Sequence, residues 1–131
     1  MSVGLLIITH GTVGQSLYDA ATSVIGSCPL RTKVVAMHFE LNRDDIIAQV
    51  KNEVDALDTG SGVLILTDMY GATPSNIACL ITEPKVAVVA GVNLPMLIRV
   101  LNYPTLPLLE LTVKAIKGGT EGIFLCRSNK D

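Results

Sequence analysis

Tryptophan is absent from this sequence, and aromatic residues make up only 4% of its 131 residues. Charged residues account for 17%, and no dense group of lysines and arginines occurs, so a nucleic-acid-binding surface is not expected. No apolar run reaches the roughly 18–20 residues that a membrane-spanning helix needs. The N-terminus lacks the basic region and cleavage site of a signal peptide.

Cysteine is scarce, and its pattern is not that of a metal site. Cys28, Cys79 and Cys126 are odd in number and show neither CxxC nor zinc-ligand spacing. Complete nucleotide-binding and hydrolase signatures such as GxxxxGK[ST], GxGxxG and GxSxG are also missing. We therefore expect a cytoplasmic protein that uses neither a metal nor an organic cofactor.

Hydrophobic residues are abundant, at 49%, and the formal net charge is only -2. This is enough apolar material for the core of one domain, which we expect to comprise residues 1–131. Because the core must be built from aliphatic side chains, the composition favours a parallel sheet that is buried on both faces.

Apolar runs alternate with segments of helical periodicity along the chain. The runs predict strands and the periodic segments predict helices. The expected strands are 3–8, 33–37, 63–66, 85–90 and a short one at 123–126, and the expected helices are 11–25, one after Asn42, 75–81, one between Pro95 and Pro104, and 107–116. The fold class is therefore α/β, an open and mostly parallel sheet with helices on both faces.

Two ionisable residues end neighbouring strands of this predicted sheet. With the strand order 2-1-3-4, the first and third strands lie side by side, so His10 and Asp68 meet at the edge where open α/β sheets bind ligands. A carboxylate that accepts from one ring N–H of a histidine fixes the tautomer and leaves the other nitrogen free to attack. We expect Asp68 to hold Nδ1 of His10 and Nε2 to become phosphorylated.

A phosphoryl group at His10 needs hydrogen-bond donors around it. Gly71, Ala72 and Thr73 precede a predicted helix, and backbone N–H groups at such a position form an anion site. Gly11 lets the backbone come close beside His10. Spacing alone leaves two interpretations open, because a single histidine at a strand end is more often structural than functional.

Three sequence blocks resemble the IIA domains of the mannose/fructose/sorbose family of the bacterial sugar phosphotransferase system (PTS). They are Thr9-His10-Gly11, residues 67–76 (TDMYGATPSN) and residues 90–96 (AGVNLPM), and the resemblance covers nearly the whole chain. It implies a protein-histidine phosphocarrier, with Thr9, Gly11, Thr67 and Asn93 supporting the site. The chain departs from the family pattern at Ala72, where a second glycine is common, and alanine does not tolerate every positive φ.

The resemblance also implies partners. His10 would take phosphate from the phosphohistidine of the carrier protein HPr and pass it to a separate IIB component, in peripheral association with the membrane components IIC and IID. Such domains are usually homodimers in which the C-terminal strand, here 123–126, crosses to the partner's sheet. Two alternatives remain at this point: a regulatory PTS phosphoprotein that transports no sugar, and a small-ligand-binding domain whose His10 is never phosphorylated.

Overall fold

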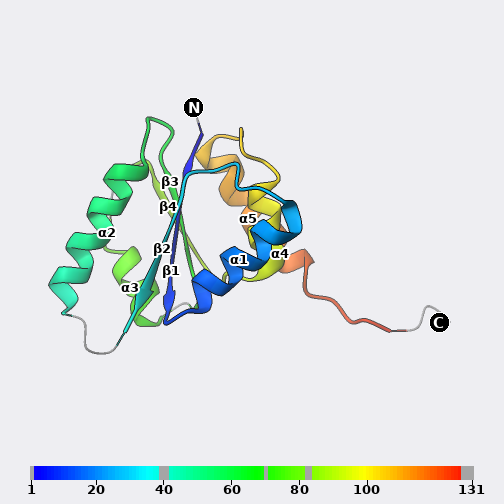
Figure 1. The fold of residues 1–131 in the computed structure, drawn as a ribbon, viewed down its shortest axis with the longest axis horizontal. Coiled ribbons are helices and arrows are strands. Elements are labelled where there is room, and N and C mark those ends of the chain that lie inside the picture. The colour runs from blue at the N-terminus through cyan, green and yellow to red at the C-terminus, as the bar shows by residue number, and fades with distance from the viewer. Residues whose placement is uncertain (1, 39–41, 70, 82–83, 128–131) are drawn as a thin grey trace.

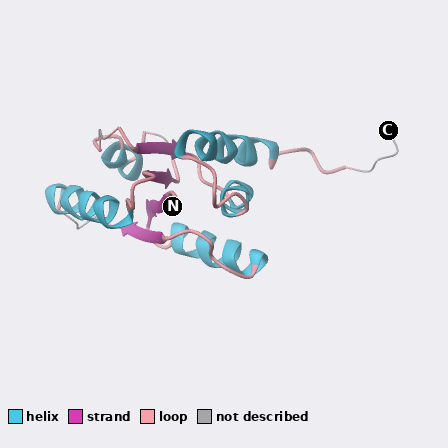
Figure 2. Cartoon of the chain, turned by 90° about the horizontal axis from the view of Figure 1, so that it is seen from above, coloured by secondary structure: helices cyan, strands magenta, loops and turns pink. Residues whose placement is uncertain are grey.

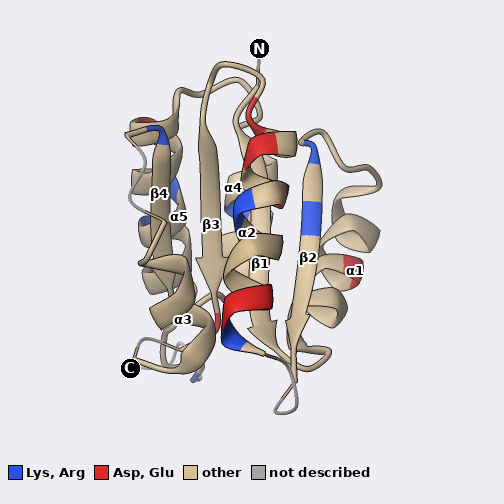
Figure 3. Ribbon diagram, turned by 90° about the vertical axis from the view of Figure 1, so that its left-hand side faces the viewer, with Lys and Arg blue, Asp and Glu red and all other residues tan. Residues whose placement is uncertain are grey.

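A single sheet of four parallel strands forms the centre of the computed structural model, which describes residues 2–38, 42–69, 71–81 and 84–127. The strands are β1 (Gly4–His10), β2 (Thr32–Met37), β3 (Val63–Thr67) and β4 (Val86–Ala90). Their order is β2-β1-β3-β4, which confirms the predicted order and is visible across the molecule in Figure 3.

Helices cover both faces of the sheet (Figure 1). One face carries α2 (Arg43–Leu57) and α3 (Thr73–Ala78), and the other carries α1 (Val13–Ile25), α4 (Leu94–Leu101) and α5 (Leu108–Glu121). The view from above in Figure 2 shows the sheet between these two helical layers. Within the described ranges, none of the helices combines the length and the apolarity required to cross a membrane.

The two central strands explain why the apolar runs are continuous rather than alternating. In β1, Leu5 and Ile7 belong to the core beneath α1, α4 and α5, whereas Leu6 and Ile8 belong to the core beneath α2 and α3. All four side chains are fully buried. Successive strand residues point to opposite faces, so a strand covered on both sides needs apolar residues at every position.

Helix ends follow their sequence signals closely in most places. Asn42 caps α2 as predicted, because its Oδ1 accepts hydrogen bonds from the N–H groups of Asp44 at 2.8 Å and Asp45 at 3.3 Å. Gly26 ends α1 with a φ of 88°, a left-handed conformation that favours glycine. Pro95 lies in the first turn of α4, where its missing N–H has no cost.

The predicted end of the last helix was wrong. Gly118 and Gly119 were expected to terminate it, but they lie inside α5, which continues to Glu121. Both glycines are buried against α4. A Cβ on Gly118 would lie 2.5 Å from Cβ of Arg99, and one on Gly119 would lie 2.8 Å from Cε of Met96. These glycines therefore allow two helices to approach closely.

The predicted strand at 123–126 is not formed within this chain. Residues 123–127 follow the end of α5 and lead away from the body of the molecule (Figure 1). Ile123, Phe124 and Leu125 are 73–74% exposed. The local sequence has the β-branched and aromatic residues of a strand, but a strand also needs a neighbouring edge, and α5 directs this segment away from β4.

Candidate functional site

His10 and Asp68 lie at the carboxyl end of two adjacent strands. His10 is the last residue of β1, and Asp68 directly follows β3. The parallel register pairs Ile8 with Thr67, which places the two polar residues just beyond the last paired positions. The sheet topology thus brings together residues that are 58 positions apart in the sequence.

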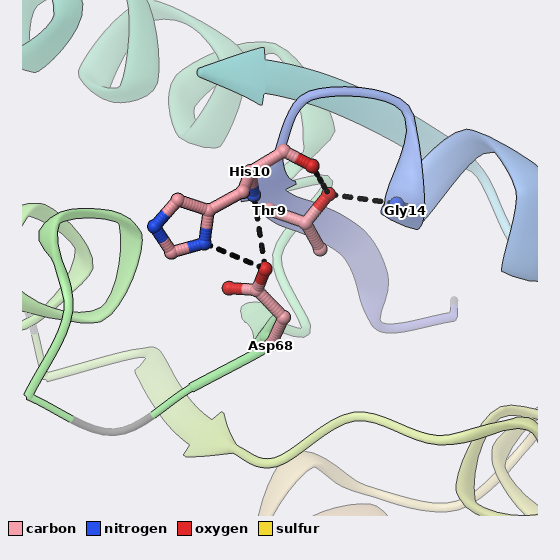
Figure 4. A network of polar contacts seen from close by, with 4 residues as sticks. All are labelled: Thr9, His10, Gly14 and Asp68. Carbon is pink, nitrogen blue, oxygen red and sulfur yellow. Dashed lines mark hydrogen bonds and ion pairs between the residues drawn. The ribbon is translucent and has the colours of Figure 1, made fainter. Parts of the chain in front are cut away.

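One carboxylate oxygen of Asp68 holds His10 at two points (Figure 4). Oδ2 lies 2.8 Å from Nδ1 of the imidazole and also accepts the backbone N–H of His10 at 3.0 Å. With Asp68 ionised, Nδ1 is the donor to this oxygen, which leaves Nε2 with its lone pair. The side chain of His10 is 48% exposed, so a partner molecule can reach Nε2.

The charge state of Asp68 follows from its surroundings. Its side chain is 15% exposed, and this partial burial alone would raise the pKa of the carboxyl group. The hydrogen bonds from the N–H and the ring of His10 act in the opposite direction and prevail, so the pKa lies below the ordinary 3.8. Asp68 is therefore a carboxylate at neutral pH and a constant acceptor for the imidazole.

The residues on either side of His10 fix the turn from β1 into α1. Thr9 is fully buried, and its hydroxyl accepts the N–H of Gly14 at 2.7 Å and donates to the carbonyl of His10 at 3.3 Å. Gly11 has a φ of 45°, and its N–H donates to the carbonyl of Met37 at 3.0 Å. Sequence reasoning missed Gly14, although a glycine in the first turn of a helix next to a strand is a signal of close packing.

The loop proposed to bind phosphate leads directly into α3. Gly71 has a φ of 83°, whereas Ala72 is the N-cap residue in an extended conformation with φ -87° and ψ 171°. Alanine at this position is therefore unstrained, because the positive φ falls on the preceding glycine. The side chain of Asn76 donates to the carbonyl of Gly71 at 3.2 Å, and the Ala72 N–H donates to the carbonyl of Met69 at 3.3 Å.

Thr67 and Asn93 are the remaining residues that were expected to support the site. Thr67 is fully buried, its carbonyl accepts the N–H groups of Gly91 and Val92 at 2.9 Å each, and its hydroxyl has no partner among the described residues. Asn93 caps α4 by accepting the N–H of Met96 at 2.9 Å and donates to the carbonyl of Gly119 at 3.1 Å. Asn93 thus joins α4 to α5.

The fold and this site define a class: an open α/β domain that presents an acid-oriented histidine at the carboxyl edge of its sheet. The model of the family described as "PTS system fructose IIA component" matches residues 4–117. The chain therefore belongs to this family of PTS IIA components, within the mannose/fructose group.

Individual relatives agree with this assignment. The chain is 32% identical over 129 residues to the mannose-specific EIIAB component of Escherichia coli K12, an alignment that covers 94% of this chain and 39% of the relative. The chain thus spans well under half of that relative's length.

Solved structures share the fold. The mannose/sorbose-specific IIA subunit from Enterococcus faecalis superposes with a TM-score of 0.87 at 24% identity, covering 99% of this chain and 98% of that one. The PTS IIA protein associated with the fucose utilization operon of Streptococcus pneumoniae gives 0.79 at 25% identity, covering 95% and 96%.

Proposed function

We propose that this protein is a phosphocarrier in which Nε2 of His10 accepts a phosphoryl group from phosphorylated HPr and passes it to a IIB component during sugar uptake. The observation that carries the proposal is the half-exposed imidazole whose Nδ1 lies 2.8 Å from Oδ2 of Asp68, in a chain of the IIA family.

The chemistry needs only the side chains of the two carriers. The lone pair of Nε2 forms a bond to phosphorus while the bond between phosphorus and the HPr imidazole breaks, and its electron pair returns to the HPr nitrogen. The proton on Nδ1 of His10 stays hydrogen-bonded to Asp68. The carboxylate stabilises the positive charge that develops on the ring, as the acid of a catalytic triad does.

Donors for the transferred phosphoryl group come from the loop before α3 in this proposal. Gly71 and Thr73 would contribute backbone N–H groups, and Thr73 also a hydroxyl. The N–H of Ala72 donates to the carbonyl of Met69 at 3.3 Å and would have to leave that contact to reach the phosphoryl group. The support is the position of the loop, which begins three residues after Asp68 and ends at the N-terminus of α3. Gly11 and Thr67 shape the two strand ends, and Asn93 acts by holding α4 against α5.

The proposed partners follow from the family. HPr is the donor, a separate IIB component is the acceptor, and the protein works in the cytoplasm in peripheral contact with the membrane components IIC and IID. Residues 1–131 are proposed to be a single IIA domain. The matching family model and the mannose-specific relative described above are sugar PTS components, and they do not favour a purely regulatory phosphoprotein.

A homodimer with exchanged C-terminal segments is also part of the proposal. In the described part of the chain, β4 pairs only with β3, so its outer edge is open. The segment 123–125 carries three large exposed apolar side chains that have no cover. On α5, Leu109, Val113 and Ile116 are exposed at a spacing that puts them on one face. A second copy would cover these surfaces.

The test of phosphoryl transfer uses the purified protein with Enzyme I, HPr and labelled phosphoenolpyruvate. His38 is the other of the two histidines in the sequence and serves as the control. The native protein and His38→Ala are expected to take up acid-labile, base-stable label, and His10→Ala is expected to take up none. Adding a purified IIB component should then discharge the label. An unlabelled native protein in the presence of labelled HPr would contradict the proposal, and label that no IIB component removes would contradict the transport role alone.

A further inference from the structure

A buried hydroxyl next to His10 connects the reactive residue to the first turn of α1. Thr9 is fully buried and points to the same side of β1 as Leu5 and Ile7, whose side chains are apolar. Valine has nearly the same shape as threonine and would suit this core without bringing a polar atom into it. The hydroxyl therefore calls for an explanation by its hydrogen bonds.

Both hydrogen bonds of this hydroxyl have a fixed direction. The N–H of Gly14 can only donate, and the carbonyl of His10 can only accept. The chain of hydrogen bonds therefore runs from the Gly14 N–H to the Thr9 oxygen, and from the Thr9 proton to the His10 carbonyl. Each bond polarises the next in such a chain.

Thr9 takes the place of an ordinary helix cap. Thr12, the N-cap residue of α1, makes no capping hydrogen bond with its side chain. The N–H of Gly14 lies in the first turn of α1, where the helix itself offers no acceptor. The hydroxyl of Thr9, on the preceding strand, accepts this N–H instead. Gly14 has room for this contact only because it lacks a side chain: a Cβ would lie 2.9 Å from both Oγ1 of Thr9 and Cγ2 of Ile7.

His10 is consequently held on both sides of its Cα atom. On the amino side, its N–H is bound by Asp68, and on the carboxyl side, its carbonyl is bound by Thr9 (Figure 4). Asp68 then also holds the ring, through Nδ1. A rotation of the His10 backbone would tilt the imidazole relative to the carboxylate, and the Thr9 hydroxyl opposes this rotation.

We propose that Thr9 is a positioning residue for phosphoryl transfer at His10, acting through its hydroxyl to keep the imidazole aligned with Asp68. This inference rests on the proposed phosphocarrier function. The buried Thr9 hydroxyl would influence the tautomer and the orientation of the half-exposed His10 ring. This effect is separate from any contribution of Thr9 to the stability of the core.

The experiment compares Thr9→Val, which removes the hydroxyl but keeps the shape, with Thr9→Ser, which keeps the hydroxyl. Thr22→Val is the matched control, because the Thr22 hydroxyl donates to the carbonyl of Tyr18 within α1, at 3.0 Å. The rate of phosphorylation by phosphorylated HPr is expected to fall about tenfold to a hundredfold in Thr9→Val, as for other misaligned reacting groups. Thr9→Ser and Thr22→Val are expected to stay close to the native rate.

The nitrogen resonances of the His10 imidazole distinguish positioning from a purely structural role. In the native protein and Thr9→Ser, Nδ1 should appear protonated and Nε2 unprotonated. In Thr9→Val, both signals should move toward an average of the two tautomers while the rest of the spectrum stays folded. A folded Thr9→Val with native rate and native imidazole signals would overturn the proposal.

Hydrogen exchange of the native protein gives a test that does not depend on a folded variant. The Gly14 amide should exchange slowly, unlike an unbonded amide of a first helical turn, and exchange as fast as that of Val13 would overturn the proposal. Failure of the phosphocarrier function would appear differently, as no label on the native protein. Failure of the Thr9 inference would appear as equal labelling rates of native protein and Thr9→Val.

Discussion

A single oxygen atom of Asp68 accepts two hydrogen bonds from the same residue, His10. The imidazole is thereby folded back toward its own backbone N–H, and its Nε2 is turned away from the carboxylate. The arrangement needs the negative charge, because a neutral acceptor binds two donors less strongly than a carboxylate does. The same two hydrogen bonds stabilise the charged form of Asp68, and the pKa of this carboxyl group is lowered for that reason.

Asp68→Asn is expected to slow phosphorylation of His10 by about a hundredfold to ten-thousandfold, in line with other losses of a tautomer-fixing acid. The amide can present its NH₂ group to Nδ1, which favours the tautomer whose Nε2 carries the proton and cannot attack. Initial rates of label transfer from HPr measure the effect.

Asp45→Asn serves as the control for this substitution, because Asp45 lies exposed in the first turn of α2. It should leave the rate unchanged. A native rate in folded Asp68→Asn would contradict the role assigned to the carboxylate.

The sequence predicted that His10 and Asp68 meet, because both follow apolar strands that the expected order places side by side. It did not predict that the His10 N–H shares the same oxygen, or that Thr9 binds Gly14. Those contacts depend on the path of the backbone through the turn of residues 10–14, and hydrophobic periodicity carries no information about that path.

At the scale of elements, the contact between α4 and α5 was the least predictable part of the fold. Gly118 and Gly119 are typical of a helix end, and sequence reasoning ended the helix there. Their burial against Arg99 and Met96 outweighs their low helix propensity, because close packing of the two helices needs small residues. The four strands and the remaining helices were predicted within a few residues, since their apolar patterns are long and regular.

Gly118→Ala is expected to lower the free energy of unfolding by about 1–3 kcal/mol, the usual effect of overpacking a tight core. The new methyl group would meet Cβ of Arg99, an atom that cannot move without the α4 backbone. Urea denaturation followed by circular dichroism measures the change. Lys117→Ala, on the exposed side of α5, is the control and should change stability little; a Gly118→Ala protein more stable than the native one would show that the helices are not in close contact here.

At the scale of the whole molecule, an open sheet edge and an uncovered apolar segment occur together. The outer edge of β4 is unpaired in the described chain, and Phe124 is 73% exposed in a segment that leads away from the body. Figure 3 shows the charged residues spread over several elements, among them α1, α2 and β2. The sequence pattern predicts a strand at 123–126, but the described chain does not form it. In the proposed dimer, a second copy would supply the neighbouring edge that this strand needs.

Phe124→Asp is expected to convert the protein from a dimer to a monomer at micromolar concentration, because a charge would enter an apolar contact. Sedimentation velocity measures the change. Val24→Asp is a matched control, since Val24 is 66% exposed on α1 and lies outside the proposed contact. A native protein that sediments as a monomer at every concentration would rule out the dimer, and a Phe124→Asp dimer would rule out the assigned role of the segment.

The direction in which residues 123–127 leave α5 has a consequence for how the protein behaves when concentrated or partly unfolded. In the proposed exchange, residues 123–125 of each chain act as a donor segment and the open edge of β4 acts as the acceptor. When two chains exchange segments reciprocally, both donor segments and both acceptor edges are used, and the assembly is a closed pair. A one-way exchange leaves a free donor segment at one end and a free acceptor edge at the other, so the assembly grows as a linear polymer. Refolding at low protein concentration would therefore favour closed pairs over linear polymers.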